Sequence, residues 1–138
     1  MRLRRAPDPS VSSAPMTDMA GTDTNTHWAA VAAKAADERL GQDTLLIDVG
    51  DVLAVTDYFV ITHGENARQV RALVDEIEKK VAEAGGPRPL RVEGPDAMQW
   101  VLLDYGSFVV HVFDAEMRAF YQLERLWGDR PRVDFRAA

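Results

Sequence analysis

Residues 100–114 read Trp-Val-Leu-Leu-Asp-Tyr-Gly-Ser-Phe-Val-Val-His-Val-Phe-Asp, and this stretch decides the fold. It contains two mostly apolar runs, 100–104 and 108–113, separated by three residues that include Gly106. Short runs rich in branched and aromatic residues are typical of strands, and a three-residue connection that contains glycine is typical of a hairpin. We therefore predict two antiparallel strands joined by a tight turn.

Three further strands are predicted upstream of this hairpin. Residues 44–49 and 58–62 are short apolar runs bounded by turn residues. The second run is apolar at almost every position, which is typical of a central strand covered on both faces. Residues 90–93 predict a short fifth strand before the turn at 94–95. The sheet would therefore have five strands.

Helices are predicted between and after these strands. Apolar residues recur every three or four positions across 66–84, which predicts an amphipathic helix. We expect Thr26 to cap a first helix that Gly41 ends, and Asp114 to cap the last one. The buried stripe of the last helix would consist of Met117, Phe120, Leu123 and Trp127. The fold class is thus α/β: a single domain with a mixed five-stranded sheet flanked by helices.

Composition divides the chain into three parts. Residues 1–26 are rich in Pro, Ser, Thr and Asp and predict a disordered N-terminal tail. Residues 27–129 contain the predicted strands and helices and form the α/β domain. Residues 130–138 carry three arginines and one aspartate and form a short basic C-terminal tail.

Length and composition exclude several classes of protein. The 138-residue chain is 46% hydrophobic, which suffices to bury a core without a disulfide or a metal. It has no cysteine, so disulfide scaffolds, iron–sulfur clusters and thiol catalysis are excluded. No run approaches the ~18 apolar residues of a membrane-spanning helix. We therefore expect a cytoplasmic protein without membrane association.

The charge of the domain indicates the kind of partner. Residues 27–129 contain ten basic and 18 acidic residues. Such a surface repels phosphate backbones, so we expect no direct DNA binding. Because opposite potentials speed encounter, it suits a basic protein partner.

Two catalytic alternatives can be built from the sequence. Nucleotidyltransferases combine a Gly-Ser turn with later carboxylates that hold magnesium, a pattern that Ser107, Asp114 and Glu116 imitate. However, Ser107 lies in a hairpin, and the two acids fit a helix cap and first turn. Carboxylates near strand ends could hold a hard cation, but such residues are more often caps; they are Asp48, Asp51 and Asp57. We expect no metal, cofactor or catalysis, with the nucleotidyltransferase as an alternative.

The hairpin also supplies candidates for an interface. Strand alternation places Trp100 and Asp104 on one face and Tyr105 on the other. His111 lies on the neighbouring strand, and Tyr121 falls outside the buried stripe of the last helix. Aromatic rings with polar groups, next to carboxylates, suit contact with arginine and lysine.

Three segments in the second half of the chain have a distinctive pattern. They read Val-Glu-Gly-Pro-Asp-Ala-Met-Gln-Trp-Val-Leu-Leu-Asp-Tyr-Gly at 92–106, Val-Val-His-Val-Phe at 109–113, and Arg-Ala-Phe-Tyr-Gln-Leu-Glu-Arg-Leu-Trp-Gly-Asp at 118–129. Together they resemble the RsfS/Iojap family of ribosomal silencing factors. Residues 56–61 and 66–70 fit the same family. The resemblance extends from about residue 28 to residue 129.

The resemblance implies a function that composition does not show. It implies binding to the large ribosomal subunit through its protein L-fourteen, steric exclusion of the small subunit, and repression of translation when nutrients are limiting. It also implies a nucleotidyltransferase-like fold without catalytic residues. We expect the contact or contact-positioning residues to be Glu93, Trp100, Asp104, Tyr105, His111 and Tyr121. A homodimer formed off the ribosome is a further expectation for the silencing factor. A homodimeric adaptor without a ribosomal role is the other alternative.

Overall fold

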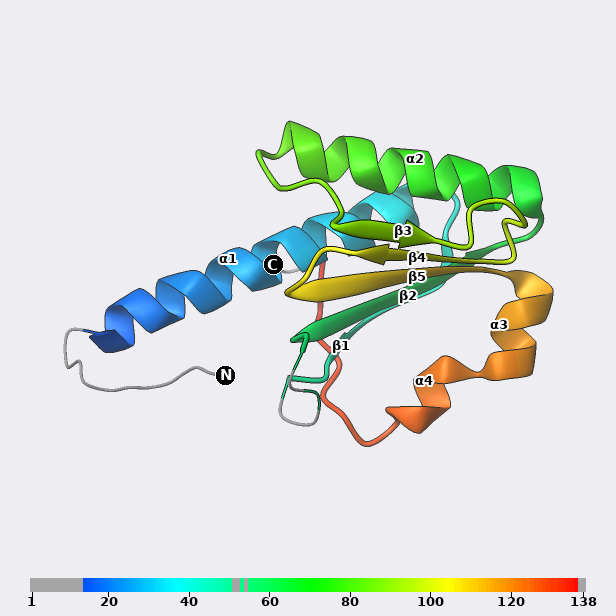
Figure 1. Cartoon of the computed structure of the whole chain (residues 1–138). Coiled ribbons are helices and arrows are strands. Elements are labelled where there is room, and N and C mark those ends of the chain that lie inside the picture. The colour runs from blue at the N-terminus through cyan, green and yellow to red at the C-terminus, as the bar shows by residue number, and fades with distance from the viewer. Residues whose placement is uncertain (1–13, 51–52, 54, 137–138) are drawn as a thin grey trace.

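Five strands form one mixed sheet in the computed structural model, which describes residues 14–50, 53 and 55–136, with side chains from residue 26 onward. The strands lie in the order β1-β2-β5-β4-β3 (Figure 1). The β2 and β5 strands are parallel, and the other neighbours are antiparallel. The bounds are β1 Gln42–Asp48, β2 Tyr58–Gly64, β3 Arg91–Glu93, β4 Trp100–Asp104 and β5 Phe108–Asp114. The predicted fold class is confirmed.

The hairpin forms where the sequence predicts it. Trp100 is paired with Phe113 at its open end, and Asp104 with Val109 near the turn. Gly106 has a φ of 89° in the turn, a left-handed conformation that glycine adopts without a Cβ penalty. The Asp104 carboxylate accepts a hydrogen bond from the Gly106 amide at 2.8 Å, which ties the turn to the end of β4.

Helices α1 (Ala14–Glu38) and α2 (Ala67–Glu83) cover one face of the sheet (Figure 1). The Asn66 side chain caps α2 by accepting a hydrogen bond from the Gln69 amide, so the predicted helix is confirmed. On α1 the buried positions are mostly alanine, whose small side chain allows close approach to its neighbours. The buried residues are Ala29, Ala30, Ala32, Ala33, Ala35 and Ala36 on α1, and Val70, Leu73, Val74, Ile77 and Val81 on α2.

Both ends of α1 differ from the prediction. The helix begins at Ala14, and the Thr26 hydroxyl lies 2.7 Å from the Tyr58 hydroxyl instead of capping the helix. Residues 14–25 thus continue the helix, whereas residues 1–13 of the predicted tail lie outside the described residues. At the other end Leu40, not Gly41, is the left-handed residue. Position 41 still requires glycine, because a Cβ there would collide with the Ala36 carbonyl. The three-part division of the chain stays a prediction.

The predicted last helix is broken in two. Its parts are α3 (Ala115–Tyr121) and α4 (Leu123–Leu126), separated by Gln122 in a left-handed conformation with φ 47°. Asp114 caps α3 as predicted, with its carboxylate 2.7 Å from the Met117 amide. Phe120, which the sequence predicts to be buried, is 74% exposed, whereas Arg118 of the same short helix is buried. The other three residues of the stripe, Met117, Leu123 and Trp127, pack against the sheet.

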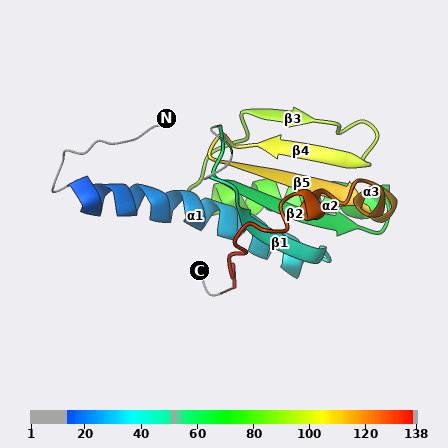
Figure 2. The same cartoon turned by 90° about the horizontal axis from the view of Figure 1, so that it is seen from below.

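The C-terminal segment lies along the free edge of β1 (Figure 2). The Val133 amide donates to the Leu46 carbonyl at 2.8 Å, and the Asp48 amide donates to the Pro131 carbonyl at 3.0 Å. Phe135 is buried in the core between the sheet and the helices. A strand edge with unpaired backbone groups invites pairing with other chains, and this segment covers part of it.

Candidate partner-binding surface

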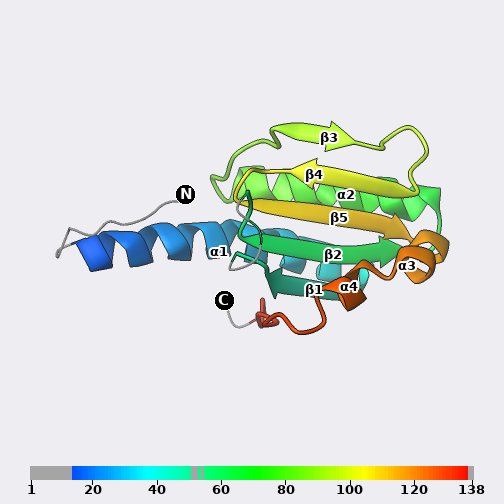
Figure 3. The same cartoon turned by 60° about the horizontal axis from the view of Figure 1, so that its bottom comes forward.

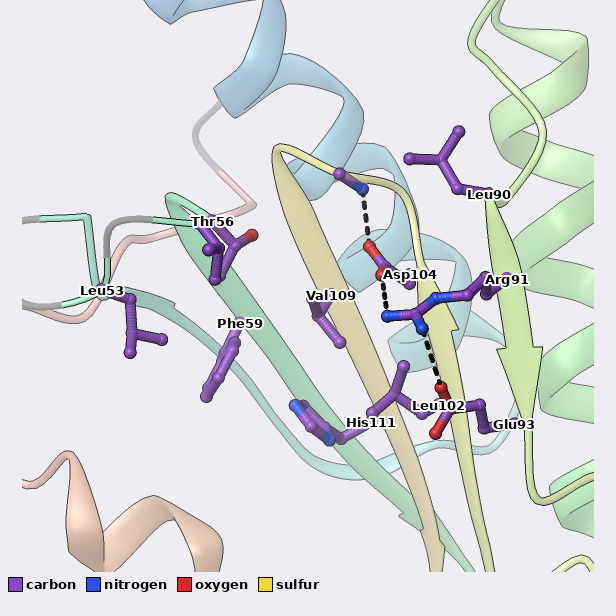
Figure 4. A pocket seen from close by; sticks show the side chains of 12 residues that line it. Leu53, Thr56, Phe59, Leu90, Arg91, Glu93, Leu102, Asp104, Val109 and His111 are labelled. Atoms are coloured by element: carbon purple, nitrogen blue, oxygen red, sulfur yellow. Dashed lines mark hydrogen bonds and ion pairs between the residues drawn. The ribbon is translucent and has the colours of Figure 1, made fainter. Parts of the chain in front are cut away.

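The second face of the sheet is only partly covered. Helices α3 and α4 lie over one part of it, and the remainder, from β3 across β4 and β5, is open (Figure 3). A depression of about 510 Å³ lies on this open part (Figure 4). Its lining residues are Leu53, Val55, Thr56, Phe59, Leu90, Arg91, Glu93, Leu102, Asp104, Gly106, Val109 and His111.

Strand alternation determines which side chains reach this surface. In β4, Trp100, Leu102 and Asp104 are partly exposed, whereas Val101 and Leu103 are buried in the core under the helices. The predicted alternation is therefore confirmed. It places the floor of the depression on three adjacent strands, β2, β5 and β4, with Phe59, Val109, His111 and Leu102.

Trp100 and His111 form a hydrogen-bonded pair at this surface. The Trp100 indole Nε1–H donates to His111 Nδ1 at 3.1 Å. Burial lowers the pKa of His111 to about 4, so its ring is neutral near pH 7. Because Nδ1 accepts a hydrogen bond, the ring proton resides on Nε2. This Nε2–H is buried and has no hydrogen-bond partner among the described residues.

Tyr121 extends the aromatic cluster onto α3. Its ring centroid lies 4.7 Å from that of Trp100, which in turn lies 4.8 Å from that of Phe113. The tyrosine is 49% exposed, so its ring is shared between the cluster and the surface. The structure thus brings together three of the six candidate residues, Trp100, His111 and Tyr121, in one cluster.

Arg118 anchors α3 to strands β1 and β2. It is 6% exposed and donates to the Asp43 carbonyl at 2.8 Å and to His63 Nδ1 at 3.1 Å. Its ion pair with Glu124 joins α3 to α4 at 3.3 Å. Burial, and then the Arg118 charge, lowers the pKa of His63, which keeps that ring a neutral acceptor. No sequence pattern marked this arginine, because basic residues are rarely buried.

Glu93 and Asp104 lie on the rim of the depression formed by β3 and β4. Arg91 pairs with both: its Nη1 lies 3.7 Å from Glu93 Oε2, and its Nη2 lies 3.2 Å from Asp104 Oδ2. Both acids were predicted from the sequence as contact candidates, whereas Arg91 was not. Its position opposite Asp104 in the strand register became evident only from the pairing of β3 with β4.

Tyr105 is separated from the other five candidates. It is 6% exposed, packs in the core under the helices, and stacks on Phe108 with ring centroids 4.5 Å apart. Burial, with a smaller effect of the Glu78 charge, raises the pKa of its hydroxyl. The structure therefore places Tyr105 on the opposite face of the sheet from the depression.

The residues of the catalytic alternatives occupy different places in the fold. Ser107 lies in the hairpin turn, Asp114 caps α3, and Glu116 is an exposed residue of its first turn. Of the three aspartates considered for a cation, Asp51 lies outside the described residues. Within the described ranges, no group of three or more His, Asp or Glu residues could hold a metal ion. None of the helices described here is long and apolar enough to cross a membrane.

Fold and surface define an α/β domain with one face of a mixed sheet covered by helices and the other partly open. Residues 22–138 match the family model described as "Ribosomal silencing factor during starvation" (RsfS). The chain belongs to this family.

Individual relatives agree with this assignment. The ribosomal silencing factor RsfS of Bacillus subtilis is 43% identical over 104 residues, which cover 75% of this chain and 87% of the relative. A crystal structure of a Chromobacterium violaceum protein is similar, with a TM-score of 0.67 at 33% identity, over 71% of this chain and 81% of that chain. The mouse protein named "Mitochondrial assembly of ribosomal large subunit protein 1" is 36% identical over 88 residues, which cover 62% of this chain and 39% of the relative.

Proposed function

We propose that this protein silences ribosomes by binding the large subunit through its protein L-fourteen and so blocking association with the small subunit. Translation would thereby be repressed when nutrients are limiting. The observation that carries the proposal is the open apolar depression with a carboxylate rim, in a member of the ribosomal silencing family. The name of the mouse relative, which refers to the large ribosomal subunit, also supports this choice of subunit.

The proposed mechanism is steric and needs no catalysis. A protein bound on the joining face of one subunit occupies the space that the other subunit requires. An apolar floor provides contact area, and carboxylates on the rim select a basic partner. The excess of acidic over basic residues in 27–129 favours encounter with a basic ribosomal protein.

Co-sedimentation with isolated subunits tests the proposal, combined with an assay of subunit joining. We expect the protein to migrate with the large subunit alone and to inhibit joining. Leu102→Glu, which places a charge in the floor, should abolish both effects. The same substitution at Leu40, an exposed residue in the turn after α1, should leave them intact.

Other outcomes would contradict the proposal. Absence of binding by the folded wild-type protein to either subunit would exclude it, as would binding that leaves subunit joining unaffected. Sedimentation of the protein alone tests the alternative of a homodimeric adaptor. Such an adaptor would migrate as a dimer and would bind neither subunit. A saturable thermal shift with nucleotide and magnesium, lost in Asp114→Asn, would favour the nucleotidyltransferase instead.

A further inference from the structure

Arg91 occupies the carboxylates that face the depression. Its guanidinium contacts Asp104 at 3.2 Å and Glu93 at 3.7 Å, so one cation of this chain pairs with two rim carboxylates (Figure 4). The Arg91 side chain is 68% exposed, and it lies at the rim rather than in the floor. The acids of this rim are thus already neutralised in part by the protein itself.

The depression beside this rim provides an apolar contact surface. Its floor is apolar, with Phe59, Leu102 and Val109. The ring of His111 lies between Phe59 and Leu102 in Figure 4, and its buried Nε2–H has no acceptor among the described residues. The His111 ring meets the Phe59 ring edge-on, with the two ring centroids 4.7 Å apart.

We propose that Arg91 is a built-in competitor for a lysine or arginine side chain of the partner, which replaces it at Asp104 and Glu93 when the partner docks on the apolar floor. This inference rests on the proposed function, because it takes the partner to be a basic ribosomal protein. Charge complementarity defines the occupant: two carboxylates beside an apolar floor suit a basic side chain with an apolar stem.

The ion pairs before and after the exchange differ in their surroundings. An exposed ion pair such as that of Arg91 contributes little, since water and salt screen it. A pair between the same carboxylates and a partner's cation would be partly shielded from water by the docked surfaces. The attraction between the charges is stronger there, and the cost of removing the charges from water offsets part of it. Arg91 therefore weakens binding modestly by competing for the acids, and its removal should strengthen binding.

Affinity measurements with isolated large subunits test this inference through Arg91→Gln. We expect this variant to bind about threefold more tightly than wild type at low salt, the size of effect that an exposed ion pair allows. The gain should diminish at high salt. The matched control is Arg71→Gln, which removes the same charge from an exposed position on α2, behind the opposite face of the sheet.

A second comparison assigns the effect to the carboxylates. Glu93→Gln should reduce affinity more in the Arg91→Gln background than in wild type, because the acid is then free for the partner. Unchanged thermal unfolding of each variant would show that the fold is intact.

The results separate the inference from the proposed function. If Arg91→Gln binds no better than Arg71→Gln, or binds more weakly than wild type, Arg91 is not a competitor and the inference is wrong. If wild type itself does not bind the large subunit, the proposed function is wrong, and this inference is overturned with it.

Discussion

Single residues at the open face differ sharply in what they can do, although the sequence grouped them together. Trp100, His111 and Tyr121 form one aromatic cluster, and Glu93 and Asp104 lie on the rim of the depression. Tyr105 is of a residue type that is common at interfaces, but it is part of the core on the other face of the sheet. A residue's type therefore identified it as a candidate, and its strand face decided its role.

Tyr105 should stabilise the fold through its buried ring and not through its hydroxyl. Because the hydroxyl is buried without a hydrogen-bond partner among the described residues, Tyr105→Phe should leave the free energy of unfolding unchanged or raise it slightly. Tyr105→Ala should lower it by about 3–5 kcal/mol, the usual cost of deleting a buried ring. Urea unfolding measures both. A Tyr105→Ala variant as stable as wild type would contradict the burial of this ring.

His111 should make the stability of the fold depend on pH. Burial lowers its folded-state pKa to about 4, below the ~6.5 of an unfolded chain. The unfolded chain therefore binds the proton more readily, so the stabilisation is full above about pH 6.5 and is lost as pH falls toward 4. Between pH 7 and pH 5 we expect a loss of about 2 kcal/mol from this group.

Urea unfolding at pH 7 and pH 5 measures this loss, and His111→Gln should remove it. The contribution of His63, whose pKa is also lowered, remains in that variant. His27→Gln is the control, because His27 is exposed. An equal pH response of His111→Gln and His27→Gln would show that His111 does not cause the effect.

Elements that lie outside the predicted domain complete the fold at its edge. The segment 131–135 pairs with β1 and inserts Phe135 into the core, although its composition resembles that of a solvated basic tail. The last helix, by contrast, breaks at Gln122 and turns Phe120 outward. An element's local pattern did not determine either result, because both depend on neighbours distant in sequence.

These two phenylalanines provide a matched comparison. Phe135→Ala should lower the free energy of unfolding by about 3–5 kcal/mol, since the ring is 4% exposed in the core. Phe120→Ala should change it by about 0.5 kcal/mol or less, because that side chain is mostly exposed. Chemical denaturation measures both variants. Equal effects would contradict the arrangement of the C-terminal segment against β1.

The whole molecule combines an excess of acidic residues with a localised apolar depression on the open face of the sheet. Long-range charge affects how often partners meet, whereas contacts at the depression affect how long they stay together. An acidic body without an exposed apolar area would attract basic proteins without selecting one. The proposed silencing role needs both properties in one domain.

Association with the large subunit should therefore slow as salt increases. Glu93→Lys should reduce the association rate more than Asp75→Lys, which makes the same charge change at an exposed position on α2. The difference between the two variants should shrink at high salt because exposed charges are screened over about 10 Å at 0.1 M. Stopped-flow measurement of association checks this, and a defect independent of salt would contradict electrostatic steering.

The sequence by itself determined the five strands, the α2 helix and the fold class, because these depend on local periodicity and turn chemistry, as in 66–84 and around Gly106. It also identified five of the candidate residues that the structure places on or beside the open face. Only the tertiary structure decided that Arg91 meets Asp104, that Arg118 is buried, that Tyr105 lies in the core, and that residues 131–135 join β1. The physical reason is that strand register, burial of a charge and edge pairing are set by partners far along the chain, whose positions no local pattern encodes.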